Sequence, residues 1–536
     1  MSITSLLPSR PTDPAPETSG RETLWERLDR PDSAALHGLM AGAVWFLIAV
    51  LLGLIMSNEL TTPDIFAGIA PLTFSRLRPA HVNMVLFGYL SMAMFGAWYF
   101  IVPRLCKTPL RSNRAANLLL FFWNLGVLAG SIAVVCGDTK GKEYAEYPMW
   151  LDWPLLIMMC VNAVIIFQTI AARREPKLYV SLWYIGGSLV WIAMMFFIGH
   201  VMWHPFTTYM LDGHKHILWN NNVGSLPDGA AITNFQRTGS LMGLDDAVYN
   251  WFYGHNVFGL YITTGGIAIV YYMVPKLAQR PLYSHLLSLI GFWSIALFYT
   301  NTGMHHLLQA PIPNWLKVFA VIGSVALIIP VFSFSVNIYM TMRGQWGQIL
   351  ENIPLRFLLI GAFLYLSASF QGTIQSLIAV NRFLHFTQWT VAHAHLALLG
   401  AFGFIASGAM LYMVPQIVRK PLWSRNLGDA QFWLLLLGIN LYFWALTVAG
   451  LAQASAWVTL GEHVGKAYPI VKPYFYLRSV AGGMIVAAVV MQLVNLYMTL
   501  RYTPEDSNDK RRKGIAELQE FPAPAAQFDD RAMAAD

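Results

Sequence analysis

Two histidines stand two positions apart inside a long apolar run. His393 and His395 lie in the segment Val391-Ala-His-Ala-His-Leu396. If this run is helical, two positions correspond to about 200° of rotation, so the two imidazoles leave opposite sides of one helix. Such a helix could hold two separate iron or copper centres against its flanks. The alternative is a pair of core histidines bonded to backbone carbonyls, but ionisable side chains inside hydrocarbon are costly and usually functional.

Six histidines in apolar runs share one expected depth in the membrane, near the non-cytoplasmic ends of four runs: His81, His255, His305, His306, His393 and His395. A six-coordinate haem takes two axial histidines, a five-coordinate haem takes one, and a copper with an open position takes three. Two, one and three make six. The number and depth of these imidazoles would therefore satisfy the ligand demand of two haem irons and one copper.

Tyr299 is a candidate for redox chemistry beside the histidines. It precedes His306 by seven positions, about two α-helical turns, so we expect it on the same side of that helix, roughly 10 Å deeper. A phenol there could supply a proton and an electron when a dioxygen bond is split. The alternative is an ordinary packing tyrosine, one of 23 in the chain.

The composition places these residues in a membrane. The chain is 56% hydrophobic and 12% charged, with a mean hydropathy of +0.49, whereas soluble domains are roughly 25% charged. The net charge of +7 fits basic loops, and no basic stripe predicts nucleic-acid binding. The three cysteines are far apart and no Cys-x-x-Cys-His occurs, so we expect no c-type haem on this chain.

The apolar runs predict an all-α, polytopic membrane protein of about twelve transmembrane helices. They fall at about 34–58, 80–103, 114–136, 149–172, 178–206, 245–274, 282–308, 314–342, 352–379, 386–415, 428–455 and 474–502. We expect 1–33 to be a polar cytoplasmic segment without a signal peptide, 34–502 to be one domain, and 503–536 to be a disordered cytoplasmic tail. The longer loops, 207–244 and 456–473, are expected on the opposite side.

Basic residues are concentrated in alternate connections between the runs. They include Arg104, Lys107, Arg111, Arg173, Arg174, Lys177, Arg419, Lys420 and Arg425. The positive-inside rule places these connections, and both termini, in the cytoplasm.

Several motifs resemble the catalytic subunit of the haem–copper oxidases, specifically of the C-type, or cbb3-type, cytochrome c oxidases. The resemblance covers about 35–502 and is specific at Leu77-Arg-Pro-Ala-His81, Lys142-Glu-Tyr-Ala-Glu146, Trp251-Phe-Tyr-Gly-His-Asn256, Tyr299 with His305-His306, and His393-Ala-His395. Gly259 fits the C-type, because other types carry their tyrosine at that position. The resemblance implies a covalent link between Tyr299 and His255, and dioxygen reduction coupled to proton translocation.

The same resemblance implies two b-type haems, low-spin b and high-spin b3, and one copper B. His81 and His395 would bind haem b, His393 would bind haem b3, and the copper ligands would be His255, His305 and His306. Arg76, Arg78 and Arg478 would pair with haem propionates. Glu143 or Glu146 would be a calcium-linked carboxylate, and Ser288 and Tyr271 would lie on a proton path from the cytoplasm.

Two positions depart from the family pattern. Gln371 and Gln388 stand where the family commonly has a glutamate and an aspartate, and an amide cannot titrate. The alternatives to an oxidase are a nitric oxide reductase on the same scaffold and a transporter with histidine relays. Tyr299, and the absence of a carboxylate just after His255, favour the oxidase.

The resemblance also implies the location and partners of the protein. We expect a multi-pass protein of the bacterial inner membrane. Because the chain carries neither a c-type haem nor paired copper-binding cysteines, electrons would come from cytochrome c through membrane-anchored cytochrome c subunits of the same complex. Those subunits would dock on the periplasmic side.

Overall fold

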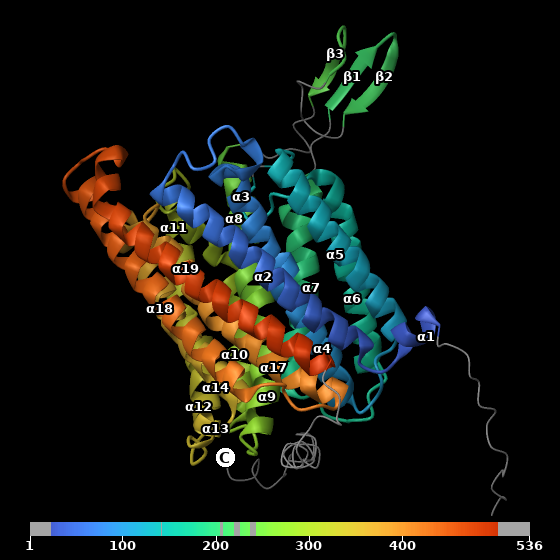
Figure 1. Cartoon of the computed structure of the whole chain (residues 1–536). Helices are drawn as coiled ribbons and strands as arrows, with labels where there is room; N and C mark the ends of the chain where they lie inside the picture. The colour runs from blue at the N-terminus through green and yellow to red at the C-terminus, as the bar shows by residue number, and fades with distance from the viewer. Residues whose placement is uncertain (1–22, 141, 204–206, 219–225, 236–242, 502–536) are drawn as a thin grey trace, which may run out of the picture.

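The computed structural model describes residues 23–140, 142–203, 207–218, 226–235 and 243–501. Twelve helical runs in this part of the chain are long and apolar enough to cross a membrane, which confirms the predicted fold class (Figure 1). They are α2 (Ser33–Thr61), α3–η2–α4 (Phe74–Cys106), α5 (Asn113–Cys136), α6 (Met149–Ala171), α7 (Val180–Gly199), α8–η5–α9 (Leu244–Leu277), α10–η6 (His285–Leu307), α11–α12 (Asn314–Thr341), α14 (Ile353–Gln375), α16–η7–α17 (Gln388–Val418), α18–η8 (Arg425–Thr459) and α19 (Val464–Arg501). Shorter helices are α1 (Leu24–Asp29), η1 (Ala70–Leu72), η3 (Val201–Trp203), α13 (Gln348–Glu351) and α15 (Ile378–Leu384).

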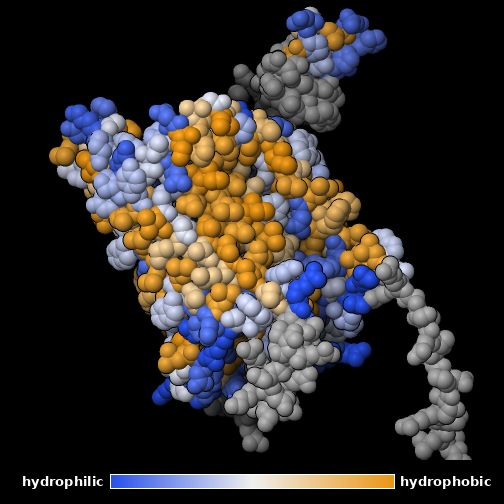
Figure 2. All heavy atoms as spheres, viewed as in Figure 1, coloured by the Kyte–Doolittle hydropathy of each residue, from blue (hydrophilic) through white to orange (hydrophobic). Residues whose placement is uncertain are grey.

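Three of the twelve runs form the centre of the bundle. Within their most apolar windows, the second, sixth and tenth runs are 94%, 94% and 83% buried, against 33–61% for the other nine described runs. The outer helices instead present apolar side chains over the middle of the molecule, with hydrophilic residues gathered toward its ends (Figure 2). A helix that is apolar on all sides needs protein or lipid around it. The central runs are also those that carry His81, His255, His393 and His395.

The central helices change their winding beside these histidines. π-helical segments begin shortly after a histidine in each central run: η2 (Met84–Leu90), η5 (Val257–Thr263) and η7 (Leu396–Gly403). The seventh run ends in a 3-10 segment, η6 (Tyr299–Leu307), which contains Tyr299, His305 and His306. π-bulges inside α-helices are frequent at functional sites. Here they adjust the direction of side chains on helices that are otherwise fixed by packing.

A small antiparallel sheet projects from one end of the bundle (Figure 1). Its strands β1 (Thr207–Leu211), β2 (His214–Leu218) and β3 (Ala231–Phe235) lie in the order β2-β1-β3. The turn between β1 and β2 uses Asp212 and Gly213, both with positive φ, as a two-residue hairpin of this type requires. We expected only a loop here. We call this end of the bundle, with the connections 62–73, 137–148 and 200–243, the sheet end.

Two predicted helix boundaries differ most from the structure. The fifth run ends at Gly199 rather than at 206, and the next residue, His200, turns into the protein. The last run begins at Val464 rather than at 474. Proline usually ends or kinks a helix, but α19 continues through Pro469 and Pro473.

At the opposite end, basic residues in the connections form ion pairs. Arg104 donates two hydrogen bonds of 2.8 Å to the Asp32 carboxylate, and Lys107 lies 2.7 Å from Glu175. Both ends of the described bundle lie here, because the number of runs is even. The predicted terminal segments fall mainly in 1–22 and 502–536, which lie outside the described residues.

Candidate metal centres

Three histidines from two helices converge into one group. His255 of α8 (Leu244–Asn256) meets His305 and His306 of η6, and the facing nitrogens all lie within 4.8 Å of one another. Nε2 of His306 is 3.2 Å from both Nδ1 of His255 and Nε2 of His305. Nitrogen ligands bound at about 2.0–2.1 Å in a tetrahedral site stand about 3.3 Å apart. Two of the three nitrogen–nitrogen distances therefore match the spacing around one metal ion, and the third histidine pair lies within 4.8 Å.

The group is held in this orientation by neighbouring residues. The Ser324 hydroxyl donates to the carbonyl of Ala320 at 2.7 Å, so it accepts from Nδ1 of His305, also at 2.7 Å, and leaves Nε2 free for a metal. The Trp251 ring stacks on His306, with centroids 3.9 Å apart and planes 17° apart. The short separation of α8 and η6 depends on Gly303. A Cβ added at this position would lie 2.2 Å from the carbonyl oxygen of Trp251.

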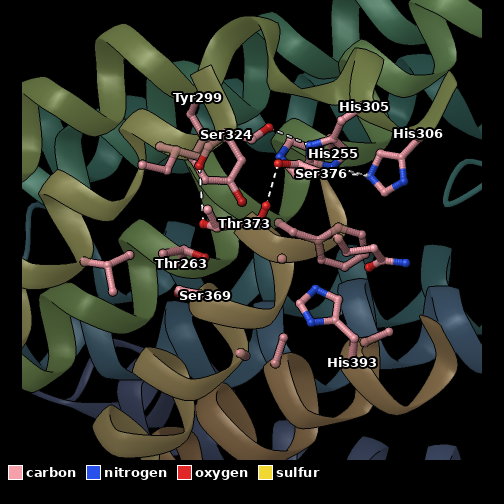
Figure 3. A pocket seen from close by; sticks show the side chains of 18 of the residues that line it. His255, Thr263, Tyr299, His305, His306, Ser324, Ser369, Thr373, Ser376 and His393 are labelled. Carbon is pink, nitrogen blue, oxygen red and sulfur yellow. Dashed lines mark hydrogen bonds between the residues drawn. The ribbon is translucent and has the colours of Figure 1, made fainter. Parts of the chain in front are cut away.

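Tyr299 lies against His255 (Figure 3). The two ring centroids are 4.8 Å apart and the planes differ by 20°. Nε2 of His255, the nitrogen not used toward His306, is buried without a hydrogen-bond partner among the described residues. The Tyr299 ring fills the space beside Gly259, where a Cβ would meet its Cε1 at 1.7 Å. The glycine at 259 is therefore required by the position of the tyrosine.

The prediction that Tyr299 lies on the same side of its helix as His306 was wrong. The segment 299–307 is a 3-10 helix, with three residues per turn. Six positions then make two full turns, so Tyr299 shares its side with His305 rather than with His306. The apolar pattern of the run did not reveal this tighter winding.

A cavity of about 200 Å³ lies between this group and His393. His255, Tyr299, His305, His306 and His393 all line it, and in Figure 3 His393 faces the three-histidine group from the other side. Nδ1 of His393 lies 3.4 Å from Oε1 of Gln371, and Gly372 lies beside the ring, where an added Cβ would be in van der Waals contact at 3.4 Å. None of the described residues that line the cavity carries a carboxylate.

The other histidine of the tenth run faces away from the cavity, as the spacing predicts. His395 instead faces His81 of α3 (Phe74–Asn83), with centroids 6.5 Å apart and planes 17° apart. Nδ1 of His81 donates to the Ala49 carbonyl at 2.8 Å, and Nδ1 of His395 to the Val391 carbonyl at 2.9 Å. Two imidazoles on opposite sides of one metal have centroids about 6 Å apart. This pair therefore fits a second, six-coordinate metal.

The three predicted arginines lie near the sheet end. Arg76 donates to the Val135 carbonyl at 3.1 Å, and Arg78 pairs with Glu143. Arg478 is only 6% exposed, and its Nε has no hydrogen-bond partner among the described residues. Its guanidinium lies over the Tyr442 ring at 5.6 Å, and the Tyr442 hydroxyl is 3.3 Å from Nε2 of His395. A buried guanidinium beside the His81–His395 pair fits an anionic group such as a propionate.

The two predicted calcium carboxylates have partners within the protein. Glu143 pairs with Arg78, and Glu146 accepts from Asn83 at 2.7 Å. Burial raises the pKa of Glu146. Within the described residues, the three-histidine group is the one cluster of at least three His, Cys, Asp or Glu side chains spaced for a metal. Calcium binding stays a prediction.

Buried serine and tyrosine side chains, with Phe334 among them, lie between the cavity and the end of the bundle that holds the termini. Ser288 and Tyr271 are fully buried. Tyr184 donates to the Ser288 carbonyl at 3.5 Å, and its ring is 5.5 Å from that of Tyr271. Phe334 stands between Tyr271 and Tyr365, with both centroid distances 5.5 Å. Tyr365 lines the cavity together with Tyr299. No local pattern in the sequence marks Tyr365, because it lies within an apolar run on α14.

Two further histidines, His385 and His200, differ in their surroundings. His385 lines the cavity, with its pKa lowered by burial. His200 lies in a buried cluster with Lys140 and Asp152, where Lys140 Nζ is 2.6 Å from both Asp152 oxygens and 3.1 Å from Nδ1 of His200. Burial and the charge of Lys140 lower the pKa of His200 to about 3. His200 is thus structural, whereas His385 belongs to the candidate site.

The architecture is that of a haem–copper oxidase. The fold matches the solved structure of a heme-copper terminal oxidase dimer with a TM-score of 0.68 and 14% identity, over 88% of this chain and 84% of that one. The family model for cytochrome c and quinol oxidase polypeptide I matches residues 33–500.

Relatives of this chain are known at the sequence level. It is 30% identical to the cbb3-type cytochrome c oxidase subunit CcoN1 of Stutzerimonas stutzeri, over 85% of this chain and 92% of that one. It is 28% identical to cytochrome c oxidase subunit 1 of Rhodobacter capsulatus, over 89% and 87%. The chain therefore belongs to the subunit I family of the cytochrome c and quinol oxidases, in its cbb3-type branch.

Proposed function

We propose that this protein is the catalytic subunit of a terminal oxidase that reduces dioxygen to water. The observation that carries the proposal is one cavity with His393 on one side, the His255–His305–His306 group on the other, and Tyr299 stacked on His255. His393 would hold a high-spin haem b3 and the three-histidine group copper B. When bound, this pair of metals would supply the site where dioxygen binds and receives electrons.

The residues fit these groups. Nδ1 of His305 and of His393 each face an acceptor, so Nε2 of each is available to a metal. His255 is oriented the other way: its Nδ1 lies toward the group, and its buried Nε2 has no hydrogen-bond partner among the described residues. His81 and His395 would be the axial ligands of a low-spin haem b, and Arg478 would pair with one of its propionates.

Tyr299 would deliver a proton and an electron to dioxygen. Its ring lies against His255, and Gly259 leaves the room that this position requires because it has no Cβ. A covalent bond between the unpartnered Nε2 of His255 and the Tyr299 ring would fix this arrangement further. Ser288, Tyr271 and Tyr365 would carry protons to Tyr299 from the end of the bundle that holds the termini.

We further propose that the sheet end faces the periplasm and that both termini are cytoplasmic, since the basic connections lie at the terminal end. Electrons would arrive from cytochrome c through membrane-anchored cytochrome c subunits near the His81–His395 pair. Proton translocation would accompany the reaction.

Nitric oxide reduction is the competing activity on this scaffold. A non-haem iron in place of copper requires a carboxylate ligand, and the described lining of the cavity has none. The Tyr299→Phe variant tests the proposal. It should retain haem and copper but lose nearly all dioxygen consumption, and peptide mapping of the unaltered protein should join the peptides with Tyr299 and His255. Separate peptides together with an active Phe variant would contradict dioxygen reduction by this mechanism.

A further inference from the structure

The connection between α5 and α6 inserts one side chain into the wall of the catalytic cavity. Tyr144, in the connection 137–148 at the sheet end, lines the cavity together with His255 and Phe258. Its ring lies edge-on to the rings of Phe258 and Trp251, with centroids 4.8 Å and 6.0 Å away. It also covers Gly254, where an added Cβ would lie 3.2 Å from Tyr144 Cδ2. The ring is therefore packed beside a residue of the three-histidine group.

Tyr144 adopts a backbone conformation that a non-glycine residue rarely takes. Its φ is +62°, in the left-handed region where a Cβ is strained. Such strain persists only where the surrounding structure over-determines the conformation, and it clusters at functional sites. Here the Tyr253 hydroxyl donates to the Tyr144 carbonyl at 3.3 Å. Tyr253 is on α8, the helix of His255, so a hydrogen bond from that helix stabilises the strained residue.

The rest of the connection is anchored on four sides by charged or polar contacts. Glu143 pairs with Arg78 and Glu146 with Asn83, both on the helix of His81. Lys140 binds the Asp152 carboxylate on α6, and Lys142 lies 3.0 Å from Asp246 at the start of α8. With both of its ends fixed in this way, the connection cannot easily withdraw Tyr144 from the cavity.

We propose that Tyr144 is a positioning residue that closes the sheet-end wall of the dioxygen cavity and keeps solvent away from the copper histidines. This inference rests on the proposed function of the cavity. Its ring fills the gap between Gly254, Phe258 and Trp251, and Trp251 in turn stacks on His306. Burial raises the pKa of Tyr144, so the side chain stays a neutral phenol. Exclusion of water at this wall would leave the path through Tyr365 as the route of protons to the cavity.

The rate at which a hydrophilic chelator removes copper tests whether Tyr144 closes this wall of the cavity. The purified, copper-loaded protein in detergent is treated with ascorbate and bathocuproine disulfonate, and the copper that remains bound is measured over time. Tyr144→Ala and Tyr144→Gly should lose copper about tenfold faster than the unaltered protein, because both open a solvent path. Tyr144→Phe, which keeps the ring, should lose it at the unaltered rate. Tyr476→Ala removes an exposed tyrosine of α19 and serves as the matched control.

The comparison of the variants separates the possible causes. The Gly variant relieves the left-handed strain, so rapid copper loss from it as well as from the Ala variant assigns the effect to the ring. Copper retention by both ring-less variants would overturn the proposal, and so would rapid loss from Tyr144→Phe. If the ring-less variants do not assemble, judged by the low-spin haem spectrum, Tyr144→Leu takes their place and must also lose copper faster. Absence of copper from the untreated, unaltered protein would instead contradict the proposed function.

Discussion

Replacement of Gly259 by alanine tests the position of Tyr299 against His255. The new Cβ would lie 1.7 Å from Cε1 and 1.8 Å from Cζ of Tyr299, whereas carbon atoms in contact stand about 3.5–4.0 Å apart. The ring must therefore move by about 2 Å, and it would leave its position against His255. Overpacking of this kind typically costs about 1–3 kcal/mol of stability. A displacement of about 1 Å at a reacting group can already cost about 100-fold in rate.

We therefore expect Gly259→Ala to assemble with haem and copper but to consume dioxygen at least about 100-fold more slowly. The assay combines an oxygen electrode with reduced cytochrome c, metal analysis, and peptide mapping of the Tyr299–His255 link, which should be absent. Gly483→Ala is the matched control, because an added Cβ there meets no atom within 4 Å, and it should leave turnover unchanged. Unaltered turnover and an intact link in Gly259→Ala would refute the assigned position of Tyr299.

Three further outcomes follow from the same geometry. His81→Ala or His395→Ala should abolish the six-coordinate haem spectrum, because each removes one axial bond; persistence of that spectrum in either variant would show that the pair is not the ligand set. Ser324→Ala should weaken copper binding by about 10–100-fold, since it removes the acceptor that orients His305, and unchanged copper affinity in a competition titration would contradict this role. Tyr365→Phe should preserve haem and copper spectra but slow dioxygen consumption, and a normal rate would exclude Tyr365 from the proton path.

The sequence predicted those features that follow from periodicity and residue type. Apolar runs located the twelve helices, and the spacing of His393 and His395 correctly predicted that they face different sites. It did not predict the winding of 299–307, because a 3-10 segment and an α-helix carry the same apolar residues over one or two turns. That change moves Tyr299 to the side of His305.

Features that depend on tertiary contacts were beyond the sequence. The left-handed conformation of Tyr144 is imposed by contacts with α8, and no glycine or asparagine marks it. Lys140, Asp152 and His200 come from three separate elements, so their ion pair has no local pattern. His385 has no local pattern that marks it as a site residue, although packing turns it toward the cavity.

The metal content of the purified protein tests the central claim most directly. Optical spectra and elemental analysis should be read together with dioxygen and nitric oxide consumption on the same sample. The account predicts two b-type haems and one copper, with dioxygen consumed at the expense of reduced cytochrome c. Non-haem iron in place of copper, with nitric oxide as the substrate consumed, would contradict it.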